Sequence, residues 1–182
     1  MLTFAVYLQD HPGALNRVAS LFRRRALNIA SLTVGHTERP GLSRMTIVVD
    51  APEAARLRIE AHLYKVLDVE RVESIAPDAV DRDLAMIKVA ATSAVRGEVM
   101  QLVDVFRARV VDVAPDSLIV EITGTEEKID GLLDVLRPYG VIEMVRTGRV
   151  SMSRGGQELK AARRRPRAAA DSVHESGVSY SV

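Results

Sequence analysis

The sequence contains no cysteine and no tryptophan, and aromatic residues make up only 4% of its 182 positions. The absence of cysteine excludes a disulfide-stabilised scaffold, thiolate metal sites and cysteine nucleophiles. Hydrophobic residues make up 47%, so a core is expected, built mainly from Val, Leu, Ile, Ala and Met. No apolar run approaches the ~20 residues of a membrane span, and no signal peptide is evident. We therefore expect a cytoplasmic protein with no membrane partner.

The net charge is also small, because 25 basic and 24 acidic side chains leave a formal charge of +1. A near-neutral chain argues against broad electrostatic binding of nucleic acid. The basic run Arg163–Arg167 lies in an Ala-, Arg- and Ser-rich stretch with no interleaved aromatic residues. We expect this stretch, residues 157–182, to form a disordered tail that does not bind nucleic acid.

In the first half of the chain, the spacing of apolar residues predicts strands and helices in turn. Residues 2–8 alternate as a strand, with Phe4, Val6 and Leu8 on one face. Asp10 to Gly13 then form a turn that begins a helix, with Asp10 as its N-cap and Pro12 in its first turn. The apolar spacing of that helix is given by Leu15, Val18, Ala19 and Phe22. Further strands are predicted at 27–34, 42–49 and 66–75, with a second helix beginning at Pro52 and marked by Ala55, Ile59 and Leu63.

The second half repeats that order of elements. The patterns predict strands at 84–91, 110–113, 118–123 and 141–150, and helices at 94–107 and 125–137. Between the halves, residues 76–79 (Ala-Pro-Asp-Ala) have the composition of a linker. The predicted fold class is α+β, with two tandem ferredoxin-like βαββαβ domains at residues 1–76 and 77–156.

Motifs that carry catalysis are absent from the sequence. There is no HExxH, GxSxG, phosphate-binding GK[ST] or GxGxxG pattern, and the four histidines are not spaced to bind a metal. The neighbouring carboxylates Asp81/Asp83 and Glu126/Glu127 are interpreted as solvated ends of elements. The sequence therefore favours a binding or regulatory module over an enzyme.

The segment from Asp10 to Leu15 is the strongest candidate for a binding site. Backbone N–H groups at the start of a helix attract an anion such as a ligand carboxylate. Gly13 lacks a Cβ and permits close approach, and Asp10 can accept a hydrogen bond from a ligand ammonium group. Together these groups suit an α-amino acid. They equally fit an ordinary capped turn between a strand and a helix, and the residues alone favour that simpler interpretation.

Motifs beyond this segment favour the binding site over the ordinary turn. The motif D-x-P-G-x-L after the first strand of a βαββαβ unit resembles the ACT domain, a regulatory module that binds amino acids. Two further stretches, N-I-A-S-L at residues 28–32 and S-R-M-T at 43–46, are similar to the small regulatory subunits of acetolactate synthase (acetohydroxyacid synthase). In the second half, residues 105–108, 111–115 and 151–155 fit the same family. The resemblance covers about residues 2–156.

The resemblance implies a non-catalytic subunit of branched-chain amino acid biosynthesis. Such a subunit binds the large catalytic subunit, raises its activity and confers feedback inhibition by valine or another branched-chain amino acid. Thiamine diphosphate, magnesium and FAD would belong to the large subunit, and this chain would carry no cofactor or metal. The effector would lie between ACT domains paired in a dimer. The family's effector positions fall on Asp10, Gly13, Ala14, Asn28 and Ile29.

Some residues depart from the family pattern or permit another interpretation. Ala26 and Leu27 replace a glycine and an aromatic residue, Ala30 replaces a glutamate, and His62 replaces a glutamine. A left-handed helix end at position 26 would cost Ala roughly 1 kcal/mol. Ile29 equally fits a buried strand position. The identity of the effector therefore stays open. The alternative function is a stand-alone ACT-type amino-acid sensor that regulates another enzyme or transcription.

Overall fold

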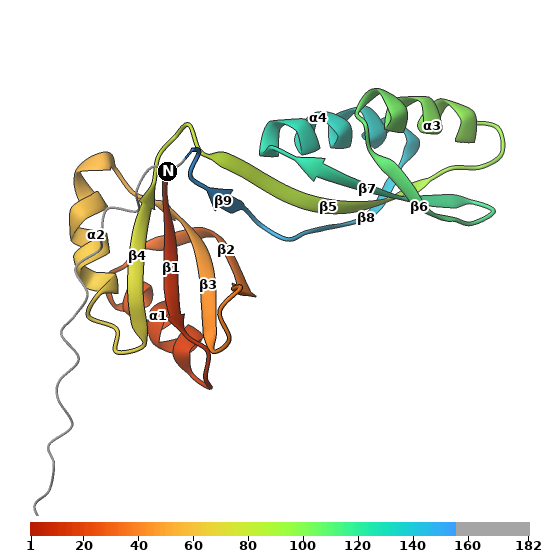
Figure 1. Cartoon of the computed structure of the whole chain (residues 1–182). Helices are drawn as coiled ribbons and strands as arrows, with labels where there is room; N and C mark the ends of the chain where they lie inside the picture. The colour runs from red at the N-terminus through yellow and green to blue at the C-terminus, as the bar shows by residue number, and fades with distance from the viewer. Residues whose placement is uncertain (156–182) are drawn as a thin grey trace, which may run out of the picture.

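The computed structural model describes residues 1–155, which form two antiparallel sheets at either end of an elongated molecule (Figure 1). Each sheet has two α-helices packed on one face. This arrangement confirms the predicted α+β class with two ferredoxin-like units. The predicted disordered tail at 157–182 lies outside the described residues. No helix in the described part of the chain is long and apolar enough to cross a bilayer.

The first sheet has the strand order β2-β3-β1-β4. Its unit consists of β1 (Leu2–Gln9), α1 (Ala14–Arg24), β2 (Asn28–His36), β3 (Leu42–Asp50), α2 (Arg56–Leu63) and β4 (Val69–Ile75). Phe4, Val6 and Leu8 of β1 are buried on the helix-covered face, as their alternation predicts. Ile59 and Leu63 of α2 pack into the same core. The strand and helix periods therefore identify the buried face of this unit correctly.

The second sheet has the order β6-β7-β5-β8, with β9 paired to the beginning of β5. Its unit consists of β5 (Val80–Ala90), α3 (Arg96–Val105), β6 (Arg109–Val113), β7 (Ser117–Gly124), α4 (Glu126–Leu136), β8 (Val141–Arg146) and β9 (Val150–Met152). Its core is separate from the first and contains Ile87, Val99, Leu118 and Ile129. Two cores of this kind allow each sheet to be stable as a unit.

The helices α1 and α3 end in the same left-handed turn. Ala26 and Arg107 both have φ of +52°, and the residue after each donates its N–H to the carbonyl five positions back. This is the Schellman arrangement, which satisfies helix-end carbonyls and usually has glycine at the left-handed position. The left-handed conformation considered for position 26 is confirmed, and a residue with a Cβ occupies it in both units.

The predicted strand at residues 141–150 is wrong as a single element. It divides into β8 and β9 around Gly148, whose φ is +88°. β9 leaves the edge occupied by β8 and pairs with residues 80–82 of β5, so β5 begins four residues before the predicted strand. This pairing joins segments about 70 residues apart in sequence, and a local apolar pattern carries no information about it.

The prediction that Asp83 is a solvated end of a strand is also wrong. Its side chain lies on the helix-covered side of β5, and the residue is only 6% exposed. Burial raises the pKa of Asp83 above its ordinary value of 3.8, while the charges of Arg146 and Arg149 oppose that shift. Asp83 forms no ion pair with another residue of the described chain.

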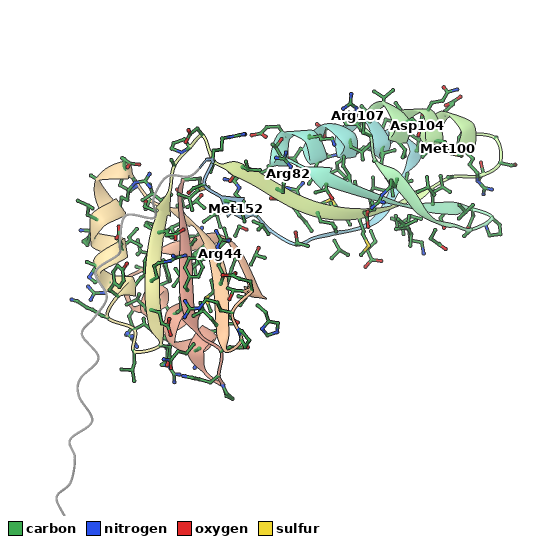
Figure 2. The ribbon with its side chains drawn as sticks, viewed as in Figure 1. Arg44, Arg82, Met100, Asp104, Arg107 and Met152 are labelled. Atoms are coloured by element: carbon green, nitrogen blue, oxygen red, sulfur yellow. The ribbon has the colours of Figure 1, made fainter. Side chains whose placement is uncertain are left out.

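The chain after β8 returns to the first sheet, and we call residues 147–154 the return segment. Thr33 of β2 donates to the Thr147 carbonyl (3.4 Å), and the Arg149 N–H donates to Ser31 Oγ (2.9 Å). Arg44 of β3 donates to the Ser151 carbonyl, and Figure 2 shows Arg44 beside the strand that carries Met152. The return segment therefore crosses the face of the first sheet that α1 and α2 leave open.

Gly148 permits this crossing, and we expect Gly148→Ala to weaken the protein. The new Cβ would lie 2.7 Å from Ser31 Oγ and 3.1 Å from Thr33 Oγ1, at a positive φ. The free energy of unfolding should fall by about 2 kcal/mol or more in chemical denaturation. Gly41→Ala is the matched control, because Gly41 has φ +77° and open space, so it should lose only about 1 kcal/mol. Equal losses would contradict a close contact at Gly148.

Burial of an unpaired carboxylate leads us to expect that Asp83→Asn stabilises the chain at neutral pH by roughly 1 kcal/mol. The folded pKa of Asp83 is raised, so its contribution to stability is largest below the unfolded pKa and is lost as pH rises through the folded pKa. Thermal unfolding of both proteins from pH 3 to pH 7 tests this. The two stability curves should separate as pH rises, and parallel curves would contradict the account.

Candidate functional site

The loop from Asp10 to Gly13 joins the end of β1 to the start of α1. Gly13 is the N-cap of α1 with φ +88° and ψ −8°, and no side chain caps the helix. The predictions that Asp10 caps this helix and that Pro12 lies in its first turn are therefore wrong. The left-handed glycine turns the chain so that α1 begins only at Ala14. Asp10 lies too early to reach the helix, and its carboxylate pairs with His36 Nδ1 at 3.1 Å.

The start of α1 leaves backbone donors available for an anion. The Ala14 N–H donates to the His11 carbonyl (3.3 Å), and the Arg17 N–H donates to the Gly13 carbonyl (3.0 Å). The N–H groups of Leu15 and Asn16 have no acceptor within the described residues. Two free donors at the positive end of an 11-residue helix form a favourable position for a carboxylate.

The side chains of this helix are rotated relative to the prediction. Its core-facing residues are Ala14, Val18, Leu21 and Phe22. Leu15, which was expected to face the core, is 45% exposed beside the free N–H groups. Ala14 takes the buried position instead, at the first residue of the helix and four positions before Val18 on the same face. Ala14 is therefore a packing residue, while Leu15 presents an apolar surface at the helix start.

A buried carboxylate holds this loop, and nothing in the sequence pattern identified it. Asp68, just before β4, has a side chain that is only 4% exposed. It accepts from Arg17 Nε and pairs with His11 Nε2 at 3.0 Å. Arg17 Nη2 also lies 3.3 Å from His11 Nδ1, and the Gln9 N–H donates to the Asp68 carbonyl. These contacts fix the first turn of α1 against the beginning of β4, across 51 positions of sequence.

Asn28 and Ile29 begin β2 and differ in their surroundings. Asn28 is exposed, and its side chain makes no hydrogen bond with another described residue. Ile29 is half-buried and packs against the first core, in agreement with its interpretation as a buried strand residue. Ala30 lies exposed at an irregularity in the β2–β3 pairing, between Ile29 and Ser31. The polar group available at this end of the strand is therefore Asn28.

A single chain does not bring the five predicted effector residues together. β1 and β2 are both antiparallel to β3, so they run in the same direction. The loop after β1 lies beside His36 at the end of β2, as the Asp10–His36 pair shows. Asn28 lies at the beginning of that strand. The eight steps from Asn28 to His36, at about 3.3 Å each, place the two ends roughly 26 Å apart. The residues form two half-sites at opposite ends of β2.

β2 is also an edge strand of the first sheet (Figure 1). Only β3 pairs with it among the described strands, so one side of its backbone has N–H and C=O groups without strand partners. Val34 on this strand is 44% exposed. In residues 1–155 no group of three or more His, Asp or Glu side chains is placed to hold a metal ion. The candidate site therefore combines helix N–H donors, an exposed amide and an open strand edge.

Comparisons with known proteins cover both halves of the chain. A family model described as an AHAS small subunit-like ACT domain matches residues 4–71, and one described as the small subunit of acetolactate synthase matches residues 82–155. The probable acetolactate synthase small subunit of Archaeoglobus fulgidus is 47% identical over 156 residues, which cover 86% of this chain and 98% of the relative. The acetolactate synthase small subunit of Mycolicibacterium smegmatis is 47% identical over 162 residues, 88% of this chain and 95% of that one.

A solved structure is similar over the same length. The crystal structure of the acetolactate synthase small subunit from Thermotoga maritima matches this chain with a TM-score of 0.81 and 38% sequence identity. The match covers 85% of this chain and 97% of the Thermotoga chain. The similarity therefore extends over both sheets and the connection between them.

The role of Asp68 in holding the loop can be tested by substitution. We expect Asp68→Asn to lower the free energy of unfolding by about 1–3 kcal/mol, because Arg17 and His11 lose their charged partner. Thermal and urea unfolding measure this loss. Asp112→Asn is the control, because Asp112 is exposed on β6 and surface changes of this kind stay within about 0.5 kcal/mol. An equal and small effect of both changes would show that Asp68 does not hold the loop.

Proposed function

The chain belongs to the family of acetolactate synthase small subunits, and from this premise we propose that it binds a large catalytic subunit, raises its activity and makes it sensitive to a branched-chain amino acid. The observation that carries the proposal is the similarity to small subunits over nearly their whole length. The match of residues 82–155 to the second part of those proteins favours this function over a stand-alone amino-acid sensor, which does not need that part.

The chemistry of acetolactate formation is assigned entirely to the catalytic partner. Thiamine diphosphate, magnesium and FAD are expected on the large subunit and none of them on this chain. This chain's own residues would act only by binding the effector and the partner surface. Its contribution to the reaction is therefore a change in the populations of two conformations of the complex.

We propose that two copies of the chain pair through β2 to complete the effector site. Antiparallel pairing of two identical edge strands supplies the backbone hydrogen bonds that β2 lacks in one chain. A two-fold axis near the middle of β2 brings Asn28 of one copy close to His36 of the other. The loop from Asp10 to Gly13 lies beside that His36. The dimer therefore joins the two half-sites that a single chain holds apart.

Each group of the joined site has a role toward an α-amino acid. The effector carboxylate is placed at the free N–H groups of Leu15 and Asn16, where the helix dipole favours an anion. The ammonium group is placed at the Asp10 carboxylate, which is half-exposed despite its contact with His36. Asn28 of the second copy adds an amide. The exposed side chain of Leu15 offers an apolar surface to a branched side chain such as that of valine.

The site is connected to the rest of the protein through the strand that carries Asn28. β2 also holds the return segment through Ser31 and Thr33, and the return segment pairs with β5 of the second sheet. An effector that links two copies at β2 would therefore favour one placement of the second sheet. We propose that this placement gives the complex with lower activity, so that effector affinity and activity are thermodynamically linked.

Gly13→Asp tests the site, because it places a carboxylate where the effector carboxylate is expected. The chain is added to its cognate large subunit, and acetolactate formation is measured with and without valine. We expect the variant to raise the activity of the large subunit as the unaltered chain does, while feedback by valine is lost. Its affinity for valine in calorimetry should fall at least tenfold.

Two control variants separate charge from backbone strain. Gly13→Ala introduces the same strain at φ +88° without the charge, and its Cβ has contacts no closer than 3.4 Å, so valine feedback should largely remain. Gly155→Asp introduces the same side chain at another positive φ, in open space. Unchanged valine affinity in Gly13→Asp would show that the site is misplaced. No effect of the unaltered chain on acetolactate formation would contradict the function itself.

A further inference from the structure

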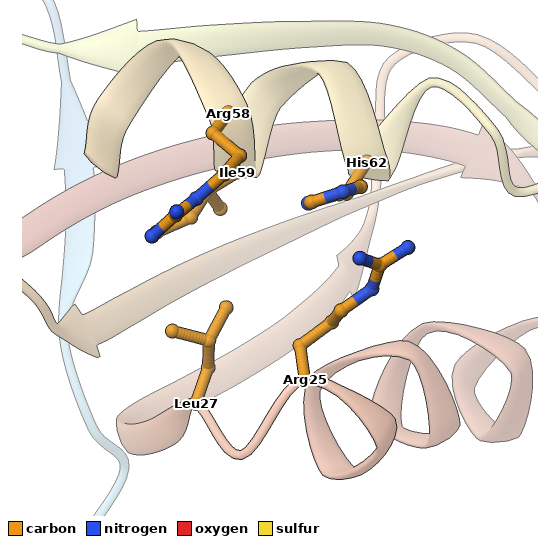
Figure 3. Close-up of a pocket in the computed structure, with 5 residues that line it drawn as sticks. All are labelled: Arg25, Leu27, Arg58, Ile59 and His62. Carbon is orange, nitrogen blue, oxygen red and sulfur yellow. The ribbon is translucent and has the colours of Figure 1, made fainter.

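A hollow of about 250 Å³ lies at the C-terminal end of α1, opposite to the loop from Asp10 to Gly13, which we call the effector loop. It is lined by Arg25 and Leu27, which flank the left-handed turn after α1, and by Arg58, Ile59 and His62 of α2 (Figure 3). With 11 residues at 1.5 Å each, α1 separates this hollow from the effector loop by roughly 16 Å. The hollow is therefore separate from the helix N–H donors of the same chain, while Leu27 on its wall directly precedes Asn28, the other half of the candidate site.

The basic side chains around the hollow have no acidic partners. Neither the Arg25 nor the Arg58 side chain forms an ion pair or hydrogen bond with another residue of the described chain, whereas the side chains of Arg17, Arg44, Arg56 and Arg71 in the same unit do. Figure 3 shows the Arg25 guanidinium group directed toward the His62 ring, with Arg58 one helical turn away on the same side of α2. Two positive charges on exposed side chains and an imidazole thus face one space without an acidic partner among the described residues.

The backbone places these residues around one space. The Schellman turn at Ala26 points Arg25 and Leu27 to the same side, because the left-handed residue between them reverses the chain. Arg58 and His62 are four positions apart on α2 and therefore lie on one face. Ile59, which is 1% exposed, and Leu27 form an apolar floor between the two elements. A basic rim over an apolar floor suits a small organic anion.

We propose that this hollow binds a small molecule that carries a phosphoryl group. Two guanidinium groups match the charge of a phosphate dianion and offer forked N–H donors to its several oxygens. A single carboxylate would neutralise only one of them. The volume of the hollow accommodates a phosphate and a few carbon atoms, and Leu27 and Ile59 provide the surface for those atoms.

His62 gives the site a pH dependence that can be measured. Burial, followed by the charges of Arg25, Lys65 and Arg58, lowers the pKa of His62 below its ordinary value of 6.5. A bound dianion counters those charges and raises the pKa, so binding takes up a proton and strengthens as pH falls. Sulfate is the suitable probe for this effect, because it stays a dianion across the range and phosphate does not.

The test is calorimetric titration of the full chain with inorganic phosphate and diphosphate at low salt, in a buffer without other multivalent anions. We expect saturable binding at one site per chain, stronger for diphosphate. Arg25→Gln and Arg58→Gln should each weaken it at least tenfold. Arg24→Gln is the matched control, because Arg24 is exposed at the same helix end but does not line the hollow. It should leave the affinity unchanged.

Sulfate titrations at pH 5.5 and pH 8 complete the experiment. The unaltered chain should bind sulfate more tightly at pH 5.5, and His62→Gln should remove most of this difference. Two results would overturn the proposal: no saturable binding of diphosphate, or equal binding by the Arg24, Arg25 and Arg58 variants. If phosphate does not bind and the Arg25 and Arg58 variants instead lose association with the large subunit, the hollow is a protein contact and the proposal is wrong.

Discussion

The direction of β1 and β2 is the constraint on which the proposed regulation depends. Both strands are antiparallel to β3, so the loop that follows β1 and the residues that begin β2 must lie at opposite ends of the sheet. The helix N–H donors and Asn28 are thereby separated by the length of a nine-residue strand. Since β2 is also the edge of the sheet, the same geometry that separates the half-sites leaves a surface through which a second copy can join them.

The other features of the first unit support this arrangement. Asp68 holds the first turn of α1 through Arg17 and His11, which keeps the free N–H groups in one position before any ligand arrives. The return segment crosses the open face of the sheet and contacts β2 itself. A change at the β2 edge therefore has a direct structural connection to β5 and the second sheet. The basic hollow lies at the far end of α1, within three residues of Asn28 in sequence, so a second ligand there would act on the same strand.

Local sequence patterns predicted the features that local forces determine. Alternation in β1 and the helical spacing of Ile59 and Leu63 identified the core, because burial of one face fixes the register of each element. The left-handed turn at Ala26, just after the end of α1, also followed from local helix termination. The start of α1 did not, because Gly13 rather than Asp10 determines the turn. The division of β8 from β9, the burial of Asp83 and the role of Asp68 depend on partners far away in sequence, which no local pattern contains.

The central claim is that one effector site needs residues from two copies, and mixing two defective chains tests it most directly. Chains carrying Gly13→Asp and chains carrying Asn28→Ala are each expected to bind valine at least tenfold more weakly than the unaltered chain. A mixed dimer pairs the intact loop of one chain with the intact Asn28 of the other. Equal mixing should therefore restore about a quarter of the valine sites in calorimetry, with the affinity of the unaltered protein. If the mixture binds no more valine than either variant alone, the site does not lie between two copies.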